Sequence, residues 1–293
     1  MGAVHGVYLK YVGLSAISIA GYTLLVNYDT TPFSAVDGGN RLLGVELNEA
    51  SLTPRMVSAA VLGYSAILNG TIAMLFQIRR GMKLIGKTNS GQIPTWSYVL
   101  WFPFHLPTIL YTYLHTKHGS YKNERNQSVP VPVASEVVPG WWIGGRYSHT
   151  LDQPFAGIVD LTVEFPELCP TQRYHLIPVW DGIPPTPAQL QDACVFAAEA
   201  IQHGHVLIHC AHGRGRSTTV MVAALVYAGL FDSWEEAFEE CRKKRKVIKL
   251  NSKMRKVLTE WQNLYILKSP EKNEMTNGVG VCGGSVVDRK KSH

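Results

Sequence analysis

The chain has few cysteines and none in a paired arrangement. Its 293 residues include five cysteines, which are scattered and show no C-x-x-C spacing. This argues against a disulfide framework and a structural zinc ribbon, and it favours a reducing compartment. The sequence also lacks an internal repeat. A cleaved signal peptide is not expected, since the first apolar run has neither a basic flank nor a small-residue cleavage pattern.

Acidic residues are outnumbered by basic ones. The 28 Lys and Arg residues against 22 Asp and Glu give a formal charge of +6 and a pI near 9.0. This balance favours an anionic partner, such as an anionic lipid, a nucleic acid or a phosphorylated substrate.

Charged residues are nearly missing from three long segments of the first 115 residues. Segment 56–78 is uncharged and long enough to cross about 30 Å of hydrocarbon at 1.5 Å per residue. Segment 11–26 is short for a span. Segment 95–114 has Pro103 and Pro107 around His105 and aromatic residues near its ends, so it either spans with a kink or turns back at the interface. The alternative is that all three are core helices of a soluble helical domain.

The second half of the sequence alternates short apolar runs with helical patterns. Runs 156–165, 174–180 and 204–210 have the length and β-branched content of buried strands. Between the last two, Thr186 and Gln189 form a capping box that predicts a helix. We therefore predict an α/β fold with a central, mostly parallel sheet flanked by helices, preceded by an α-helical transmembrane region. The predicted units are a membrane region of two or three helices (1–115), a linker (116–137), the α/β domain (138–268) and a disordered tail (269–293).

The sequence HCAHGRGRST at residues 209–218 joins the last predicted strand to a helix. This edge of a parallel sheet binds ligands, and a helix N-terminus offers free N–H groups to an anion. Gly213 and Gly215 allow the tight turn that lets these N–H groups converge. Arg216 follows Cys210 by six residues and can bind two phosphate oxygens. Both the guanidinium and the helix end lower the pKa of Cys210, which becomes a nucleophile for phosphorus.

Three other interpretations fit parts of this stretch. His209, Cys210 and His212 could bind zinc, but neighbouring residues at a strand end point in opposite directions. A rhodanese-like sulfurtransferase also carries a cysteine on an anion loop. A phosphate-binding module without activity is the third. The combination of cysteine, arginine and an upstream aspartate favours a phosphatase over all three.

Residues 209–217 match the pattern HCxxGxxR[ST], and residues 138–267 resemble the cysteine-dependent protein tyrosine and dual-specificity phosphatase superfamily. The resemblance implies a thiophosphoryl intermediate on Cys210, with Arg216 holding the equatorial oxygens. It implies that Ser217 steadies the thiolate and that His209 orders the loop. The implied phosphate-binding residues are Ala211, His212, Gly213, Arg214, Gly215 and Arg216. No metal, cofactor or nucleic acid is expected.

A leaving group needs a proton, so a carboxylic acid is expected close to the cysteine. Asp181 ends an apolar run 29 residues before Cys210, which is similar to the family's acid loop. Asp192 is the competitor, but it falls inside a predicted helix. Asp160 and the run 141–146 also resemble the start of the dual-specificity domain, where their roles are structural.

The substrate is either a phosphorylated protein or a phospholipid. Arg214 is an additional basic residue inside the loop and resembles the lipid-directed branches, whose headgroups carry several charges. The basic run 240–256 could contact an anionic bilayer at about 1 kcal/mol per residue. The plain alternatives are that Arg214 and this run are solvated surface charges, and that His115 and His118 are solvated linker histidines.

The side of the membrane depends on the third apolar segment. Arg79, Arg80, Lys83 and Lys87 mark the loop after segment 56–78 as cytosolic, and residues 26–55 are net acidic and face away. A full third crossing would place the catalytic domain on the far side. A segment that turns back would keep it in the cytosol, which the free-thiol chemistry favours.

Overall fold

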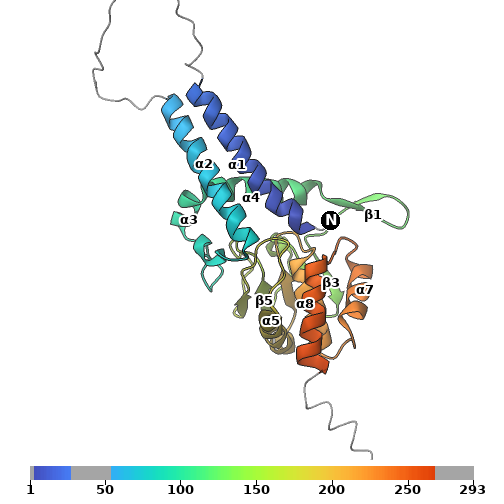
Figure 1. Cartoon of the computed structure of the whole chain (residues 1–293). Helices are drawn as coiled ribbons and strands as arrows, with labels where there is room; N and C mark the ends of the chain where they lie inside the picture. The colour runs from blue at the N-terminus through green and yellow to red at the C-terminus, as the bar shows by residue number, and fades with distance from the viewer. Residues whose placement is uncertain (1–2, 28–53, 268–293) are drawn as a thin grey trace, which may run out of the picture.

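The computed structural model describes residues 3–27 and 54–267. Helices α1 (Ala3–Asn27) and α2 (Pro54–Gln77) pack side by side and project away from the rest of the chain (Figure 1). Small residues allow this close approach: the Ser15 hydroxyl donates to the Ala66 carbonyl at 2.8 Å, and Gly21 lies against Leu62. Residues Tyr8–Asn27 and Pro54–Gln77 have the length and hydropathy of candidate membrane spans. We call α1 and α2 the helix pair.

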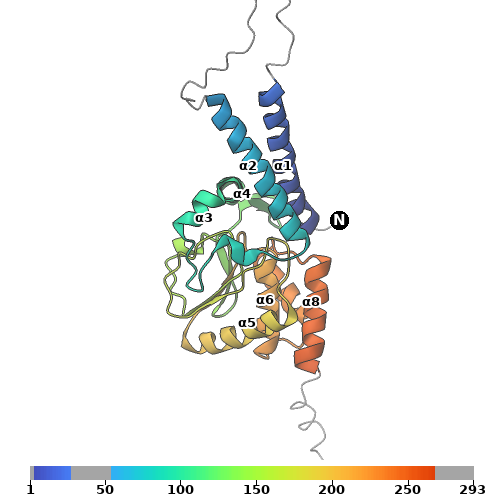
Figure 2. The same cartoon turned by 60° about the vertical axis from the view of Figure 1, so that its left-hand side comes forward.

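The third apolar segment forms two helices. Helix α3 (Thr95–Leu100) ends at Trp101, and α4 (Phe102–His118) starts directly after it with Pro103 in its first turn. Helix α4 lies across the lower part of the helix pair, between it and the α/β domain (Figures 1 and 2). It does not run alongside α1 and α2. The segment is therefore not one continuous helix parallel to the helix pair.

The stretch predicted as a linker is structured. Helix α4 extends to His118, and strands β1 (Ser120–Lys122) and β2 (Ser128–Pro130) then form an antiparallel hairpin. Strand β3 (Ala134–Val138) already belongs to the main sheet.

The main sheet has the order β3-β4-β7-β5-β6. Strand β4 (Trp141–Gly144) pairs antiparallel with β3. The other neighbours, β5 (Gly157–Asp160), β6 (Tyr174–Leu176) and β7 (Val206–His209), pair in parallel. The prediction of an α/β fold with a mostly parallel central sheet is therefore confirmed. The register pairs Asp160 with His209, so the ends of β5 and β7 meet at one edge of the sheet.

Four helices build the core of the α/β domain. They are α5 (Pro187–Ala200), α6 (Arg216–Tyr227), α7 (Trp234–Lys244) and α8 (Ser252–Gln262). Helix α5 begins with the predicted capping box of Thr186 and Gln189. Helix α6 is buried along most of its length and packs against the other three, two of which, α5 and α8, are seen beside it in Figure 2. The described residues also contain short helical segments at Met82–Ile85, Ser148–Thr150, Ile201–His203 and Asn263–Leu267. The predicted tail at 269–293 lies outside the described residues.

The helix pair and the α/β domain share one hydrophobic cluster. Phe76 of α2 and Phe104 of α4 pack on Trp180, with ring centroids 6.1 and 5.8 Å away. The Trp180 indole N–H donates to the Arg80 carbonyl at 2.9 Å. The residue next to Asp181 is thus fixed by contacts from the N-terminal region.

Candidate active site

The glycine loop, residues 209–217, connects β7 to α6. Gly213 has φ +64°, and a Cβ there would lie 2.6 Å from the carbonyl carbon and oxygen of Gly144. Only glycine fits this position without strain. Gly215 has φ −118°, and a Cβ there would lie 3.1 Å from the terminal methyl of Met254, a close contact with a flexible side chain.

Cys210 is buried at the start of the glycine loop. Its Sγ lies 3.4 Å from the Ser217 hydroxyl. Burial by itself raises the pKa of the thiol, but the Arg216 charge opposes this effect most strongly. The Ser217 hydroxyl and the backbone N–H groups of Ser217 and Arg214 add to the opposition, so the pKa lies below its ordinary value. A lowered pKa increases the thiolate fraction, which is the nucleophilic form.

Arg216 is almost fully buried and tightly held. Its Nη2 lies 2.7 Å from Oε1 of Glu164, and its Nη1 donates to the carbonyls of Leu161 and Val179 at 3.1 and 2.8 Å. Its Nε has no hydrogen-bond partner within the described part of the chain. A buried donor without a partner is costly, and this one is suited to an anion in front of the loop.

Asp181 lies beside Arg216, with Oδ1 3.3 Å from Nη2. Its side chain is 40% exposed and reaches the same cavity as Cys210. The competitor Asp192 is an exposed residue of α5 and does not line this cavity. The geometry therefore brings Asp181, and not Asp192, together with the cysteine and the arginine.

A cavity of about 540 Å³ lies in front of the glycine loop. Besides Cys210, Arg216 and Asp181, its wall includes the basic side chains of Lys10, His115, Arg214 and Lys249 and the ring of His212. They come from α1, α4, the loop itself and the segment before α8. We call this space the phosphate cavity, because its charge and its free N–H donor suit an oxyanion.

The predicted phosphate-binding residue His212 packs in an aromatic cluster. The His115 ring meets it edge-on at 4.8 Å, and Tyr111 stacks on His115 at 5.5 Å. Burial lowers the pKa of His212 to about 4, so its imidazole is neutral at pH 7. The interpretation of His115 as a solvated linker residue is wrong, because α4 carries it to the glycine loop. His118 is exposed, as expected.

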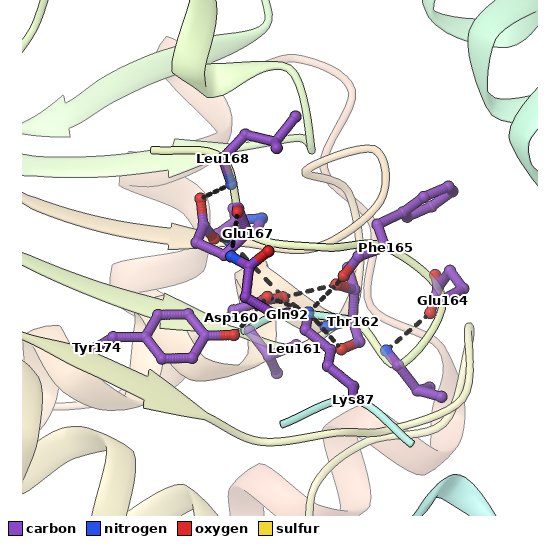
Figure 3. Close-up of polar contacts among 12 residues, drawn as sticks. Lys87, Gln92, Asp160, Leu161, Thr162, Glu164, Phe165, Glu167, Leu168 and Tyr174 are labelled. Atoms are coloured by element: carbon purple, nitrogen blue, oxygen red, sulfur yellow. Dashed lines mark hydrogen bonds and ion pairs between the residues drawn. The ribbon is translucent and has the colours of Figure 1, made fainter. Parts of the chain in front are cut away.

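His209 connects the glycine loop to a buried ion network that also includes Lys87, Asp160 and Glu167. Its Nε2 lies 2.6 Å from Glu167 and 3.6 Å from Asp160. Asp160 also pairs with Lys87 and accepts a hydrogen bond from Tyr174 at 2.9 Å (Figure 3). Burial by itself lowers the pKa of His209, but Asp160 and Glu167 outweigh it and raise that pKa to about 9. His209 is therefore charged at pH 7.

The carboxylates of this network already have cationic partners. Ligand atoms of Asp160, Glu167 and His209 lie within 4.8 Å of one another, a spacing that a metal ion could use. Lys87 donates to Asp160 and to both oxygens of Thr162 (Figure 3). His209 faces Glu167 whereas Cys210 faces Ser217, so these two do not converge on one zinc.

Arg245 supports the glycine loop from below. It is buried, its Nε donates to the Gly213 carbonyl at 2.8 Å, and its Nη1 donates to Ser135 and Pro132. The basic run 240–256 is therefore not one uniform surface. Arg242 and Lys243 are exposed, whereas Arg245 holds the loop and Lys249 lines the phosphate cavity.

Five residues of the site were not predicted from the sequence: Lys10, Lys87, Glu164, Glu167 and Arg245. All but Lys10 contact the glycine loop or the buried ion network from far along the chain, and no local pattern marks the contacts of Lys87 and Arg245. For Glu164 and Glu167, however, the sequence does contain a signal. They interrupt an apolar run, and a buried carboxylate in such a run requires a cationic partner.

The part of the chain that carries Asp181, Cys210 and Arg216 matches a known family. Residues 155–264 match the family model of the dual specificity phosphatase catalytic domain. No curated protein matches the chain.

Similar solved structures include human DUSP28, with 21% identity over 46% of this chain and 96% of that chain and a TM-score of 0.41. Tk-PTP in the active form has 27% identity, coverage of 45% and 97%, and a TM-score of 0.39. PTPMT1 in complex with PI(5)P has 21% identity, coverage of 45% and 96%, and a TM-score of 0.37.

Proposed function

The chain is a phosphoric monoester hydrolase with a phosphatase domain of the dual-specificity type, and we propose that it is anchored in a membrane and acts on a phospholipid. The observation that carries the proposal is the composition of the phosphate cavity. A thiol with a lowered pKa, a buried arginine with a free Nε and a carboxyl group surround one space.

In the proposed mechanism, the Cys210 thiolate attacks phosphorus and the bond to the leaving oxygen breaks. Arg216 and the backbone N–H groups of the glycine loop hold the equatorial oxygens. Asp181 protonates the leaving oxygen, and the product alcohol departs. Asp181 then takes a proton from water as the water attacks the thiophosphoryl group, which releases phosphate and the thiolate. Ser217 stabilises the thiolate through its hydroxyl.

The lipid part of the proposal is supported by the additional cations of the phosphate cavity. Arg214 lines it, as does Lys249, and α1 contributes Lys10 from the apolar N-terminal region. A substrate with a second anionic group would pair with these side chains, whereas a single phosphate would leave them unused. The Lys10 ammonium lies 3.5 Å from the centre of the Tyr111 ring, which holds it beside the cavity.

Membrane anchoring is supported by the surface of the N-terminal region. Among the described residues, most of the large exposed apolar side chains belong to α1, α2, α3 and α4. The start of α1 and the end of α2 both lie beside the catalytic domain (Figure 1). If the helix pair enters a bilayer, the exposed Arg79, Arg80 and Lys83 stay on the side of the catalytic domain, and the positive-inside rule makes this side cytosolic. Lys87 does not count here, because its side chain is buried in the ion network.

The experiment is a phosphate-release assay with the full chain in nanodiscs. The substrates are phosphotyrosine and phosphoserine or phosphothreonine peptides, phosphoinositides and phosphatidylglycerophosphate. We expect the lipids to be hydrolysed faster, Cys210→Ser to abolish release, and Arg214→Ala to lower the lipid rate more than the rate on a small aryl phosphate. Full activity of Cys210→Ser would overturn the mechanism. Preference for phosphopeptides would overturn the lipid assignment and leave a membrane-tethered protein phosphatase.

A further inference from the structure

A second cavity of about 460 Å³ lies between α1 and α4, directly beside the phosphate cavity. Its wall is mostly apolar. Helix α1 contributes Leu14 and Ile17, α4 contributes Phe104 and Pro107, and Trp180 closes the end toward the catalytic domain. We call this space the apolar groove.

The apolar groove and the phosphate cavity meet. Four residues line both of them: Lys10, Tyr111, Asp181 and His212. Asp181 is the proposed acid, so the leaving oxygen must lie beside it during the reaction. Whatever group is attached to the leaving oxygen therefore starts at the junction of the two cavities.

The other end of the apolar groove reaches the outer surface of the N-terminal region. Ile17 and Leu9 line the groove and are 71% and 58% exposed. Both residues belong to α1 and fall within the candidate membrane span Tyr8–Asn27. A hydrocarbon chain leaving the groove at this end would meet the exposed apolar faces of the helix pair instead of water.

We propose that the apolar groove binds the hydrocarbon chain of the substrate, so that the substrate is a lipid phosphate whose chain begins within a few bonds of the leaving oxygen. This inference rests on the proposed function and makes it more specific. The scissile phosphate binds at Cys210 and Arg216, the leaving oxygen lies at Asp181, and the chain passes between α1 and α4. The cationic side of the junction and the apolar side of the groove complement the two ends of such an amphiphile.

The same geometry makes the N-terminal helices part of the substrate site. Helices α1 and α4 form walls of this site, because Lys10, Tyr111 and His115 line the phosphate cavity. Removal of the helices would therefore remove part of the substrate site. A test of which substrate the site prefers therefore requires the full chain.

Gly13 offers a direct way to fill the apolar groove. It lines the groove, and a Cβ at this position would meet nothing within 4 Å. Replacing a glycine in a helix interior also favours the helix. Gly13→Phe should therefore place a ring in the groove without disturbing the fold. Ile19→Phe is the matched control, because Ile19 is 52% exposed on the same helix and does not line the groove.

The experiment measures kcat/KM for n-alkyl phosphates of four to ten carbons with the full chain in phosphatidylcholine nanodiscs. For the unmodified chain we expect kcat/KM to rise about twofold to fourfold per added methylene. Partition of long chains into the nanodisc also produces a rise, but it does so equally for every variant. The decisive quantity is the ratio of decyl to butyl phosphate, which Gly13→Phe should lower at least tenfold and Ile19→Phe should leave unchanged.

Ile17→Gln is a second variant at an exposed position, and it should lower the same ratio by several-fold. A ratio that is the same in all variants, with activity still dependent on Cys210, would overturn the groove assignment alone. Activity that survives Cys210→Ser would instead overturn the proposed mechanism. The two failures are thus distinguishable.

Discussion

The guanidinium of Arg216 and the carboxylate of Glu164 form a buried ion pair, with Nη2 and Oε1 2.7 Å apart. Two main-chain carbonyls hold Nη1 of the same guanidinium. The pair therefore fixes the direction in which the free Nε points, which is the direction of the phosphate cavity in the proposed mechanism.

Glu164→Gln tests the importance of this orientation. Glutamine keeps the shape of the side chain but removes its charge, so Arg216 loses its strongest tether. We expect kcat/KM on p-nitrophenyl phosphate to fall roughly tenfold to a hundredfold, and the free energy of unfolding to fall by about 1–3 kcal/mol. Steady-state kinetics and urea denaturation measure the two effects. Glu239→Gln, on the exposed face of α7, should change neither, and unchanged kinetics in Glu164→Gln would contradict the orienting role.

The second prediction concerns Asp181 as the proposed proton donor. Asp181→Asn keeps the size of the side chain and removes its proton. Turnover should fall by roughly two to four orders of magnitude on alkyl phosphates, whose leaving groups need a proton, and much less on p-nitrophenyl phosphate. The ratio of the two rates is the readout. Equal losses on both substrates would make Asp181 a structural residue, and Asp192→Asn is the control because Asp192 lies outside the cavity.

The glycine loop was predictable because its residues lie together in the sequence, and the position of Asp181 was predictable from the resemblance to the family's acid loop. Cys210, Gly213 and Arg216 lie within seven residues, and the Thr186 and Gln189 pattern correctly predicts the capping box at the start of α5. The supporting residues are different. Lys87 reaches Asp160 across 73 residues, and Arg245 reaches Gly213 across 32. Such contacts depend on how elements pack, and a sequence pattern does not contain that information.

In the apolar segments, too, the sequence predicts the local features but not the long-range contacts. Their length and lack of charge predicted two or three membrane helices, and two helices, α1 and α2, have the length and hydropathy of candidate spans. That α1 would also bring Lys10 to the wall of the cavity that holds Cys210 depends on tertiary packing, in which Tyr11, Phe76 and Phe104 share one cluster with Trp180.

The third prediction concerns pH. The pKa of His209 is raised from 6.5 to about 9 in the folded chain, so its ion pairs stabilise the fold fully below pH 6.5. This stabilisation is lost as the pH rises through about 9, and it amounts to roughly 3 kcal/mol. Glu167→Gln removes the nearest negative charge, which lowers the pKa of His209.

The expected result for Glu167→Gln is a melting temperature that is already reduced at pH 7 and that changes less between pH 7 and 10 than in the unmodified chain. Scanning fluorimetry over this pH range measures it. Glu260→Gln, an exposed site on α8, should reproduce the unmodified profile. If Glu167→Gln shows the unmodified profile as well, deprotonation of His209 does not cause the fall in melting temperature at alkaline pH.

The last prediction links the helix pair to the chemical step. Phe76 of α2 is 2% exposed and packs on Trp180, the neighbour of Asp181. Phe76→Leu should weaken this support and let the acid move, at a cost in the free energy of unfolding of about 1–2 kcal/mol. Because the acid matters most for poor leaving groups, turnover of alkyl phosphates should fall several-fold more than turnover of p-nitrophenyl phosphate.

A purely structural role of Phe76 would lower both rates together, so the ratio distinguishes the two roles. Ile67→Leu, at a site on α2 that is 73% exposed, should leave the ratio unchanged. The double variant Phe76→Leu with Asp181→Asn gives the sharpest answer. If Phe76 acts through Asp181, it should cause no further change of the ratio once the acid is gone, since the effects of coupled residues are not additive. An additive effect would mean that Phe76 influences the chemical step through groups other than Asp181.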